Sequence, residues 1–245
     1  MNLAPWLASM KAADIAALAF FLIVWLGYEP LLKALSRRGG AINRDMTVIR
    51  AAWMRNMAMG DQRLMDANLM GHALNSASFF ASSNLILIAA VVGVLFGGET
   101  SFKTASSLVL IKTSSRLLFE TKLALVLIAL ARGLLDLIWS IRQMNYTLAA
   151  IGAAPPAGDR RLEAYGRAAA GLLNPALSSF NAGVRGYYFA LASAAWLFGG
   201  VAFFLATAGA LAMLLMRQRR SPASRAIRRL RVLIGEGPDE PEPRP

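Results

Sequence analysis

The sequence predicts an all-α membrane protein, a polytopic bundle of four membrane-spanning helices joined by long amphipathic helical connectors. Composition is the first indication: 56% of the 245 residues are hydrophobic, 16% are charged and the mean hydropathy is +0.48, whereas soluble domains carry about 25% charged residues. The second is the gathering of apolar residues into four runs, each long enough for a helix that crosses a hydrocarbon core of roughly 30 Å.

The first two predicted spans lie at residues 12–32 and 79–96. We interpret the first as a retained span and not as a cleaved signal peptide. The reason is that the segment after its apolar stretch, Gly27-Tyr28-Glu29-Pro30, has no small-residue cleavage pattern.

The third predicted span, residues 123–141, is interrupted by Arg132 and Asp136, and the fourth, residues 187–216, is almost uncharged. The fourth exceeds one straight crossing, so we expect it to tilt or to begin in the headgroup region. A chain with four spans has both ends on the same side of the membrane. Its Lys and Arg residues divide almost evenly between the two sides, so the charge rule leaves the orientation open.

Two long connectors, residues 35–78 and 142–186, are predicted to contain amphipathic helices. The first reads as helix from about Thr47 and continues into the second span. The second is broken by Gly152-Ala153-Ala154-Pro155-Pro156-Ala157-Gly158, after which Asp159 can cap a helix. The order span, connector, span occurs twice, and residues 66–69 resemble residues 174–177. This pattern predicts a two-fold internal repeat, with chance similarity between amphipathic helices as the alternative.

Residues 221–245 are predicted to form a basic amphipathic segment followed by a disordered tail. A helix from Ser224 to Ile234 would carry Ile227 and Leu230 on one face and arginines around the rest. Such a helix binds anionic headgroups at a membrane surface. The residues beyond it are rich in proline and acidic residues, a composition typical of disorder.

The composition also excludes several kinds of chemistry. The chain has no cysteine and a single histidine, His72, which excludes disulfides, thiolate nucleophiles, iron–sulfur clusters and a histidine-rich metal site within one chain. We therefore expect no enzymatic activity, no cofactor and no metal. The formal net charge is +12. Because the basic residues flank apolar runs, we expect anionic lipid headgroups as partner, and not nucleic acid.

Six polar or charged membrane positions are candidates for a site: Arg132, Asp136, Asn84, Asn68, His72 and Asn75. Arg132 and Asp136 are four residues apart on one helix face. Charges at membrane depth usually face protein or water, so this pair either lines an ion or proton path or fixes the packing of the third span. The other four lead into the second span. They form either a polar seam that binds an ion or small ligand, or hydrogen bonds between helices.

A second group of candidates lies at the membrane boundaries of the last two predicted spans. It comprises Arg142, Asn145 and Tyr146 at the end of the third span and Asn181, Arg185 and Tyr187 at the start of the fourth. Arginine and aromatic residues at a boundary are typical of anchors in the headgroup region. The functional interpretation is a shared headgroup or ligand pocket where the two connectors meet.

Several segments together resemble one known family. They are Trp53-Met54-Arg55, Asp66-Ala67-Asn68-Leu69, Ser78-Phe79-Phe80-Ala81-Ser82-Ser83, Trp139-Ser140-Ile141-Arg142-Gln143-Met144-Asn145-Tyr146, Ile151-Gly152-Ala153-Ala154-Pro155-Pro156 and residues 180–190. In this order, the chain from about residue 12 to residue 220 resembles the integral membrane proteins of domain-of-unknown-function family 599 (DUF599), found in bacteria and plants. The resemblance implies a four-span membrane protein and no particular activity. Residues 131–137 depart from the family's more aromatic pattern, and the basic tail beyond Ser221 lies outside the resemblance.

Two hypotheses for the function follow. The first is an oligomeric transport or channel protein; a single four-span chain is a thin bundle, so this hypothesis requires a homo-oligomer. The second is a non-catalytic accessory or scaffold subunit of a larger membrane complex, bound through helix faces made of small residues. A membrane enzyme acting on lipid is disfavoured, because no concentration of His, Asp and Glu stands out before the tail. We expect a multi-pass protein of the cell membrane, which is the inner membrane in a bacterium.

Overall fold

The computed structural model describes residues 10–37, 42–109, 111–112 and 115–234. These residues form helices and no strands, as the sequence predicts. The helices are α2 (Ala12–Arg37), α3 (Ile42–Met59), α4 (Arg63–Phe96), α5 (Gly98–Ser106), α6 (Arg116–Gly152), α7 (Leu162–Ala194), α8 (Gly200–Arg220) and α9 (Pro222–Leu233), with a short 3-10 helix, η1 (Ala195–Phe198), before α8.

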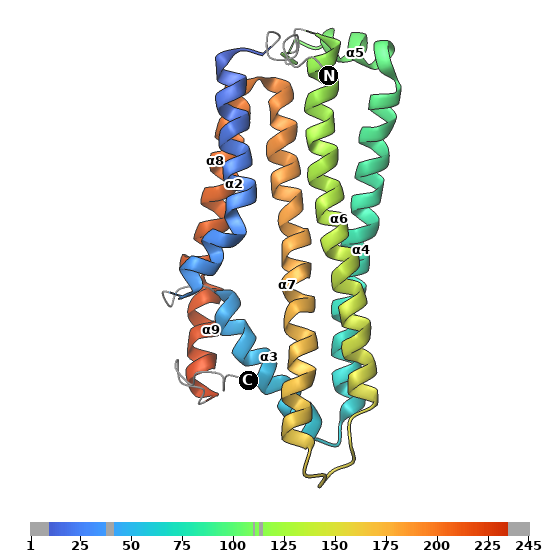
Figure 1. The fold of residues 1–245 in the computed structure, drawn as a ribbon, viewed down its shortest axis with the longest axis vertical. Coiled ribbons are helices and arrows are strands. Elements are labelled where there is room, and N and C mark those ends of the chain that lie inside the picture. Colours follow the sequence, from blue (N-terminus) through green and yellow to red (C-terminus); the bar gives the residue numbers. More distant parts are fainter. Residues whose placement is uncertain (1–9, 38–41, 110, 113–114, 235–245) are drawn as a thin grey trace.

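The long helices stand side by side, and the chain alternates in direction along the bundle (Figure 1). It descends in α2, rises in α4, descends in α6, rises in α7 and descends in α8. The helix α7 stands in the middle, with α6 and α4 on one side and α2 and α8 on the other. It packs along α6, which also packs on α4, while α2 packs mainly on α8.

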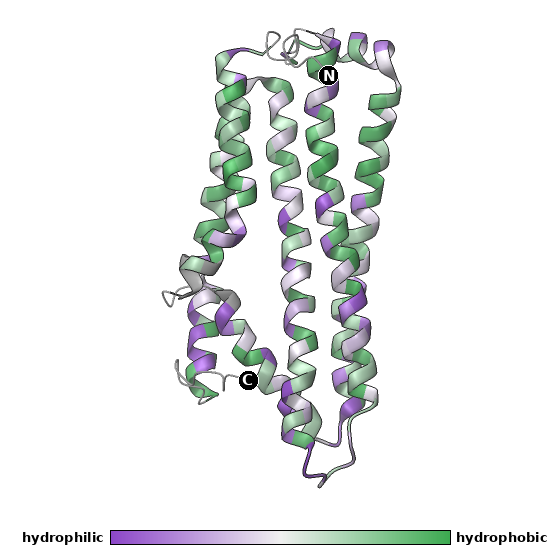
Figure 2. Ribbon diagram, viewed as in Figure 1, coloured by the Kyte–Doolittle hydropathy of each residue, from purple (hydrophilic) through white to green (hydrophobic). Residues whose placement is uncertain are grey.

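The bundle has an apolar end and a polar end, shown in Figure 2. Exposed large apolar side chains cover α2, α4, α6 and α8 in the upper half, among them Ile23, Ile86, Ile128 and Val201. The lower half holds α3, α9 and the lower turns of α4, α6 and α7. At 1.5 Å per residue these last three helices are each roughly 50 Å long. They are therefore longer than a hydrocarbon core of roughly 30 Å and extend beyond the apolar half.

Four helices are long and apolar enough to cross a membrane, which confirms the predicted number: α2, α4, α6 and the stretch that begins with α8. The prediction of one continuous helix over residues 187–216 is wrong. The chain reverses at η1, so α7 ends at Ala194 and α8 begins at Gly200. The turn contains Gly199, whose φ of +113° is one that glycine adopts readily. The rest of the turn is apolar, so the hydropathy of the run does not fall there.

The helix α7 is a fifth long helix beside the four apolar ones. It contains polar residues such as Asn181 and Arg185, and its neighbours cover it on two sides. Because of this additional traverse, α2 and α8 both run downward from the upper end of the bundle, and α8 ends near its middle, where α9 follows (Figure 1). The direction of the helices does not by itself place a membrane, so the sharing of one side by both ends stays a prediction. The two-fold internal repeat stays a prediction.

Three hydrophobic clusters hold together the part of the bundle that the structure describes, and two of them are large. The upper one is aromatic, with Phe21, Tyr28, Phe189, Trp196 and Phe203 all nearly inaccessible to solvent. The lower core contains buried methionines, Met54, Met57, Met70 and Met144, packed against α7. Unbranched methionine side chains adapt to irregular gaps, which suits a core built from helices that cross at different angles.

The predicted basic segment forms α9, which packs on α3. Arg231 of α9 pairs with the buried Asp45 of α3 at 2.8 Å. Arg225, Arg228 and Arg229 are exposed. The helix is therefore attached to the polar end of the bundle and still presents cations. The predicted disordered tail, residues 235–245, lies outside the described residues.

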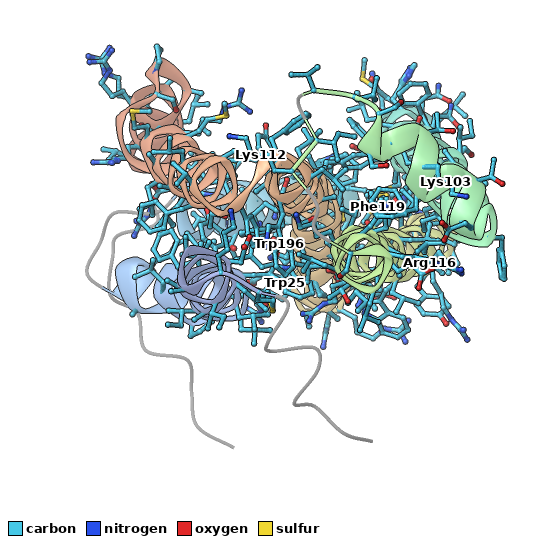
Figure 3. The ribbon with its side chains drawn as sticks, turned by 90° about the horizontal axis from the view of Figure 1, so that it is seen from above. Trp25, Lys103, Lys112, Arg116, Phe119 and Trp196 are labelled. Carbon is cyan, nitrogen blue, oxygen red and sulfur yellow. The ribbon has the colours of Figure 1, made fainter. Side chains whose placement is uncertain are left out.

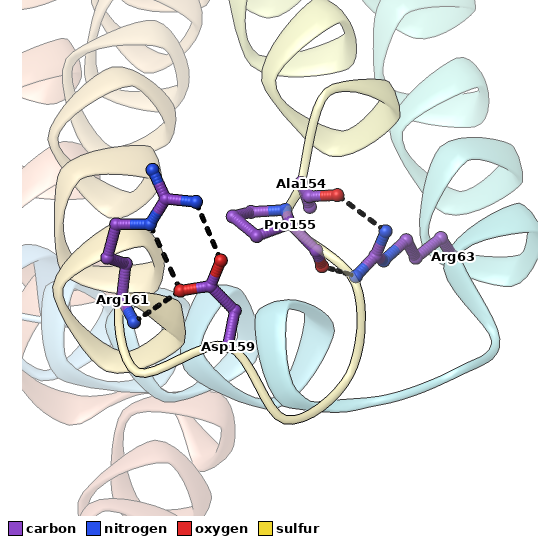
Figure 4. A network of polar contacts seen from close by, with 5 residues as sticks. All are labelled: Arg63, Ala154, Pro155, Asp159 and Arg161. Atoms are coloured by element: carbon purple, nitrogen blue, oxygen red, sulfur yellow. Dashed lines mark hydrogen bonds and ion pairs between the residues drawn. The ribbon is translucent and has the colours of Figure 1, made fainter.

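The turn between α6 and α7 is fastened to the start of α4 (Figure 4). The Arg63 guanidinium donates to the carbonyl of Ala154 at 2.6 Å and to that of Pro155. Asp159 accepts from the backbone and side chain of Arg161, and these bonds hold the pKa of Asp159 at about 2. A lowered carboxyl pKa stabilises the fold above the ordinary pKa near 4. That contribution is lost only as the pH falls through 2, so this turn is insensitive to pH near neutrality.

We expect Arg63→Ala to loosen this turn. The change removes two hydrogen bonds from a charged donor, each of which contributes about 1.5–3 kcal/mol. Amide hydrogen exchange over residues 153–158 should become at least about tenfold faster. Arg160→Ala, which removes an exposed side chain from the same turn, is the control. Exchange in Arg63→Ala that matches this control would show that the two bonds do not hold the turn.

Candidate functional site

Four charged side chains from three helices gather where α2 diverges from α7. Glu29 comes from α2, Arg132 and Asp136 from α6, and Arg185 from α7. Arg185 pairs with Glu29 at 3.2 Å, and Arg132 pairs with Asp136 at 3.8 Å, as their spacing predicts. We call these four residues the charged cleft. They join segments that lie more than a hundred residues apart in the sequence.

The charged cleft lines two adjoining cavities. The first, of about 220 Å³, is also lined by Trp25, Leu26, Tyr28 and Phe189. The second, of about 340 Å³, continues along α7 past Ser178 and Ser179. Glu29, Arg132, Asp136, Ala182 and Arg185 border both cavities. One wall of the first cavity is therefore aromatic, whereas charges dominate the border between the two.

The charges lie on helices that are largely apolar, close to where the polar half of the bundle begins. On α6 the exposed apolar surface continues beyond Arg132 through Leu135 and Ile138. The Arg132 side chain is nevertheless 56% exposed and that of Glu29 is 48% exposed. Charged groups at this depth are costly against hydrocarbon and usually face protein, water or one another. The charged cleft therefore requires a polar environment in front of it.

Glycines bring α6 and α7 together behind the charged cleft. A Cβ added at Gly186 would lie 2.8 Å from the Cα of Gly133, and one added at Gly183 would lie 3.0 Å from the Gly133 carbonyl oxygen. The two backbones thus touch, as small residues permit in membrane bundles. Arg132 is next to Gly133 in the sequence, and Arg185 is next to Gly186. The close crossing therefore sets how the two arginines approach one another.

Two residues of α2 that line the first cavity carry polar groups without an ordinary partner. The hydroxyl of Tyr28 is buried and has no hydrogen-bond partner among the described residues, although the Tyr28 ring lies under the Arg185 guanidinium at 5.5 Å. Pro30 lies within the helix and has no N–H, so the carbonyl of Leu26 lacks its helical donor. Tyr28, Leu26 and Pro30 all line this cavity.

The structure divides the polar residues predicted on α4. Asn84 is buried and donates to the carbonyl of Leu130 on α6 at 3.1 Å, so it joins two helices. Asn68, His72 and Asn75 are exposed on the outer side of α4. These three residues therefore do not form a seam with Asn84 inside the bundle.

The structure also separates the residues of the predicted boundary pocket. Arg142 and Tyr146 bond to one another at 2.5 Å and, like Asn145, are exposed in the lower half of α6. On α7, Tyr187 donates to the Phe80 carbonyl at 2.5 Å. The α6 segment near Arg142 instead lies beside an earlier part of α7, since Ser140 donates to Ala176. Asn181 is half-buried between these positions, and only Arg185 belongs to the charged cleft.

A second polar cluster lies inside the upper end of the bundle, where no site was predicted. Lys122 is 1% exposed and donates to the carbonyl of Lys112 at 2.8 Å. Trp196 donates to Asp14 at 2.7 Å and lies 5.8 Å from the Lys122 ammonium. Seen from above, Trp196 lies near the middle of the bundle, whereas Lys103 and Arg116 lie toward α5 (Figure 3). The sequence signal for this cluster was a charged residue near the start of each of two apolar helices, Asp14 in α2 and Lys122 in α6.

Among the residues that the structure describes, no three His, Asp or Glu side chains are grouped so as to hold a metal ion. The ligands available at the charged cleft are guanidinium, carboxylate, hydroxyl and carbonyl groups. These groups bind charged or hydrogen-bonding solutes.

The fold and the charged cleft define an all-helical protein with four helices that could span a membrane, packed around a charged and less apolar fifth helix. The family model described as "Protein of unknown function, DUF599" matches residues 16–223. The chain therefore belongs to the DUF599 family, as the resemblance implied. No curated protein and no solved structure matches the chain.

Proposed function

We propose that this chain is an integral membrane transport protein that binds a small charged solute in the charged cleft, with no enzymatic activity. The observation that carries the proposal is that four ionisable side chains from three helices border two adjoining cavities close to where the polar half of the bundle begins. Ligand sites are concave and combine apolar walls with a few placed polar groups. The aromatic wall and the opposed charges of the cleft fit that description.

The exposure of the charges favours transport over a purely structural role. An ion pair that fixes packing is expected to be covered by the helices it joins. Here, the side chains of Arg132 and Glu29 are about half exposed. The first cavity, which both residues line, leaves room for a solute between α2 and α7. A hydrated cleft lowers the cost of these charges at membrane depth.

The orientation follows from the fifth traverse of the bundle by α7. The described Lys and Arg residues at the apolar end are Lys11, Lys103, Lys112, Arg116 and Lys122. Those at the polar end are far more numerous: Lys33, Arg37, Arg44, Arg50, Arg55, Arg63, Arg142, Arg160, Arg161, Arg167, Arg217, Arg219, Arg220, Arg225, Arg228, Arg229 and Arg231. Positive residues favour the cytoplasmic side. The polar end therefore lies in the cytoplasm, where the arginines of α9 attract anionic headgroups.

Hydration of the charged cleft tests the proposed function. The chain has no cysteine, so single-cysteine variants report one position each. We expect Ala182→Cys, at the border of both cavities, to react with a charged maleimide in the membrane, because the reactive thiolate forms in water. The control, Leu191→Cys, is on the same helix at a residue that is 71% exposed on the apolar surface; it should stay unreactive. If both variants are equally unreactive, the cleft is dry and the proposal fails.

A second candidate function is a non-catalytic accessory subunit of a larger membrane complex. The observation that favours it is the outer face of α4, a helix that packs mainly on α6. This face exposes Leu85 and Ile86, and nothing lies within 4 Å of a Cβ added at Gly93. A partner helix or a second copy of the chain fits such a face. The mass of the gently extracted particle separates the two: foreign subunits in fixed ratio support the accessory role, and a homo-oligomer supports transport.

A further inference from the structure

The charged cleft is electrically balanced. Two guanidinium groups, from Arg132 and Arg185, are matched by two carboxylates, from Glu29 and Asp136. A solute that carries only one charge would leave a net charge in the cleft. Leaving a partly buried charge without its partner is unfavourable, and more so where water is scarce. A ligand with one positive and one negative group avoids this cost, because it can exchange partners with an existing ion pair.

Two polar groups of α2, in residues that line the first cavity, can take part in such an exchange. The Tyr28 hydroxyl, beneath the Arg185 guanidinium, can donate to an anionic oxygen. The Leu26 carbonyl, freed by Pro30, can accept from an ammonium group. The hydroxyl would thus assist the Arg185 guanidinium in binding an anion, and the carbonyl would assist the Glu29 carboxylate in binding a cation.

From this arrangement, and resting on the proposed function, we infer that the charged cleft binds a zwitterionic group, an ammonium joined by a short chain to a carboxylate or phosphate. The acidic group replaces Glu29 on Arg185 and accepts from the Tyr28 hydroxyl. The ammonium group binds Glu29 and Asp136, with the Leu26 carbonyl as a further acceptor. The aromatic wall of Trp25 and Phe189 contacts the apolar part of the ligand.

Two sources can supply this chemistry. One is a free amino acid, for which a cavity of about 220 Å³ is large enough to hold a small solute. The other is the ethanolamine phosphate headgroup of a membrane lipid, which can enter from the side because Glu29 and Arg132 are about half exposed. Both sources present an ammonium and an acidic oxygen, so the experiment has to distinguish them.

The experiment measures how fast Ala182→Cys reacts with a charged maleimide in lipid nanodiscs made of phosphatidylglycerol alone. The probes are an equimolar mixture of the common amino acids without cysteine, phosphoethanolamine, and the controls acetate, phosphate and ethylamine, each of which carries charge of one sign only. A parallel set of nanodiscs contains phosphatidylethanolamine and no soluble probe. At a concentration of ten times its Kd, a zwitterion leaves only about a tenth of the sites free, so it should slow the maleimide reaction about tenfold.

Protection by amino acids in phosphatidylglycerol discs identifies a free solute, and protection by phosphatidylethanolamine identifies the headgroup; either result supports the inference. Arg185→Gln in the Ala182→Cys background should lose the protection. Glu29→Gln is measured beside it, so that a folding defect in one variant does not decide the outcome. Equal protection by acetate, phosphate or ethylamine overturns the inference, and so does a reactive cysteine that no zwitterion protects. An unreactive Ala182→Cys is a different result, because it contradicts the proposed function itself.

Discussion

Alanine at Gly186 and at Gly171, two positions of the same helix, should change stability in opposite directions. The Cβ of Gly186→Ala would lie 2.8 Å from the Cα of Gly133, a backbone atom that cannot turn aside as the end of a flexible side chain can. Overpacking of this kind costs about 1–3 kcal/mol. Nothing lies within 4 Å of a Cβ at Gly171. There, alanine should stabilise α7 by up to about 1 kcal/mol, because glycine is a poor helix former.

The thermal midpoint of each purified variant in detergent checks this expectation. Gly186→Ala should melt below the parent protein and Gly171→Ala at or above it. Gly186→Leu, with a larger side chain, should fail to give a monodisperse protein. If Gly186→Ala melts at the same temperature as Gly171→Ala, α6 and α7 do not cross at these glycines. The placement of Arg132 and Arg185 around one cavity would then be contradicted as well.

Lys122→Met is the second change with a large expected effect. It keeps the length of the side chain and removes its charge at a position that is 1% exposed. The carboxylate of Asp14, which attracts Lys122, would remain buried with Trp196 as its side-chain donor. Leaving a buried carboxylate without a cation nearby is costly, and the change also removes the hydrogen bond from Lys122 to the Lys112 carbonyl. We therefore expect a marked fall in the thermal midpoint and a loosened contact between α2, α6 and η1.

A double variant tests the cause of that fall. Asp14→Asn added to Lys122→Met removes the uncompensated charge and keeps an oxygen that accepts from Trp196, so it should recover part of the lost stability. Lys103→Met, on α5, removes an exposed lysine from a surface pair with Glu99 and should change little, since such pairs contribute about 0–1 kcal/mol. Additive effects of the two buried changes would contradict the coupling of Lys122 with Asp14.

The helical elements of this chain follow largely from local patterns, whereas the traverse by α7 does not. The apolar runs near residues 12–32, 79–96 and 123–141 lie within α2, α4 and α6, because a helix exposed to lipid must be apolar over its whole width. A helix covered by its neighbours is not bound by that requirement, and α7 carries Asn181 and Arg185. Hydropathy alone therefore does not separate the end of α7 from α8, and the two were predicted as one span. The pair Gly199-Gly200 was the local signal of the turn.

The charged cleft was predictable only in part. The spacing of Arg132 and Asp136 predicts their ion pair, because residues four apart share a helix face. Glu29 and Arg185 are 156 residues apart, and only the packing of three helices brings them together. The stripe of Asn68, His72 and Asn75 has the correct helical spacing, but spacing alone does not say which face of α4 meets α6. In this fold that face carries Asn84.

The proposed orientation has α7 cross the membrane in addition to the four helices that are apolar enough to span it, and the sidedness of three single cysteines in sealed vesicles tests this central proposal most directly. Thr104 on α5, Ala157 in the turn before α7 and Ala223 on α9 are all exposed. With five crossings, an impermeant maleimide reaches Thr104→Cys from outside the cell only, and reaches Ala157→Cys and Ala223→Cys from the cytoplasmic side only. If Ala223→Cys reacts on the same side as Thr104→Cys, the chain crosses four times, α7 is not a separate crossing, and the proposed orientation is contradicted.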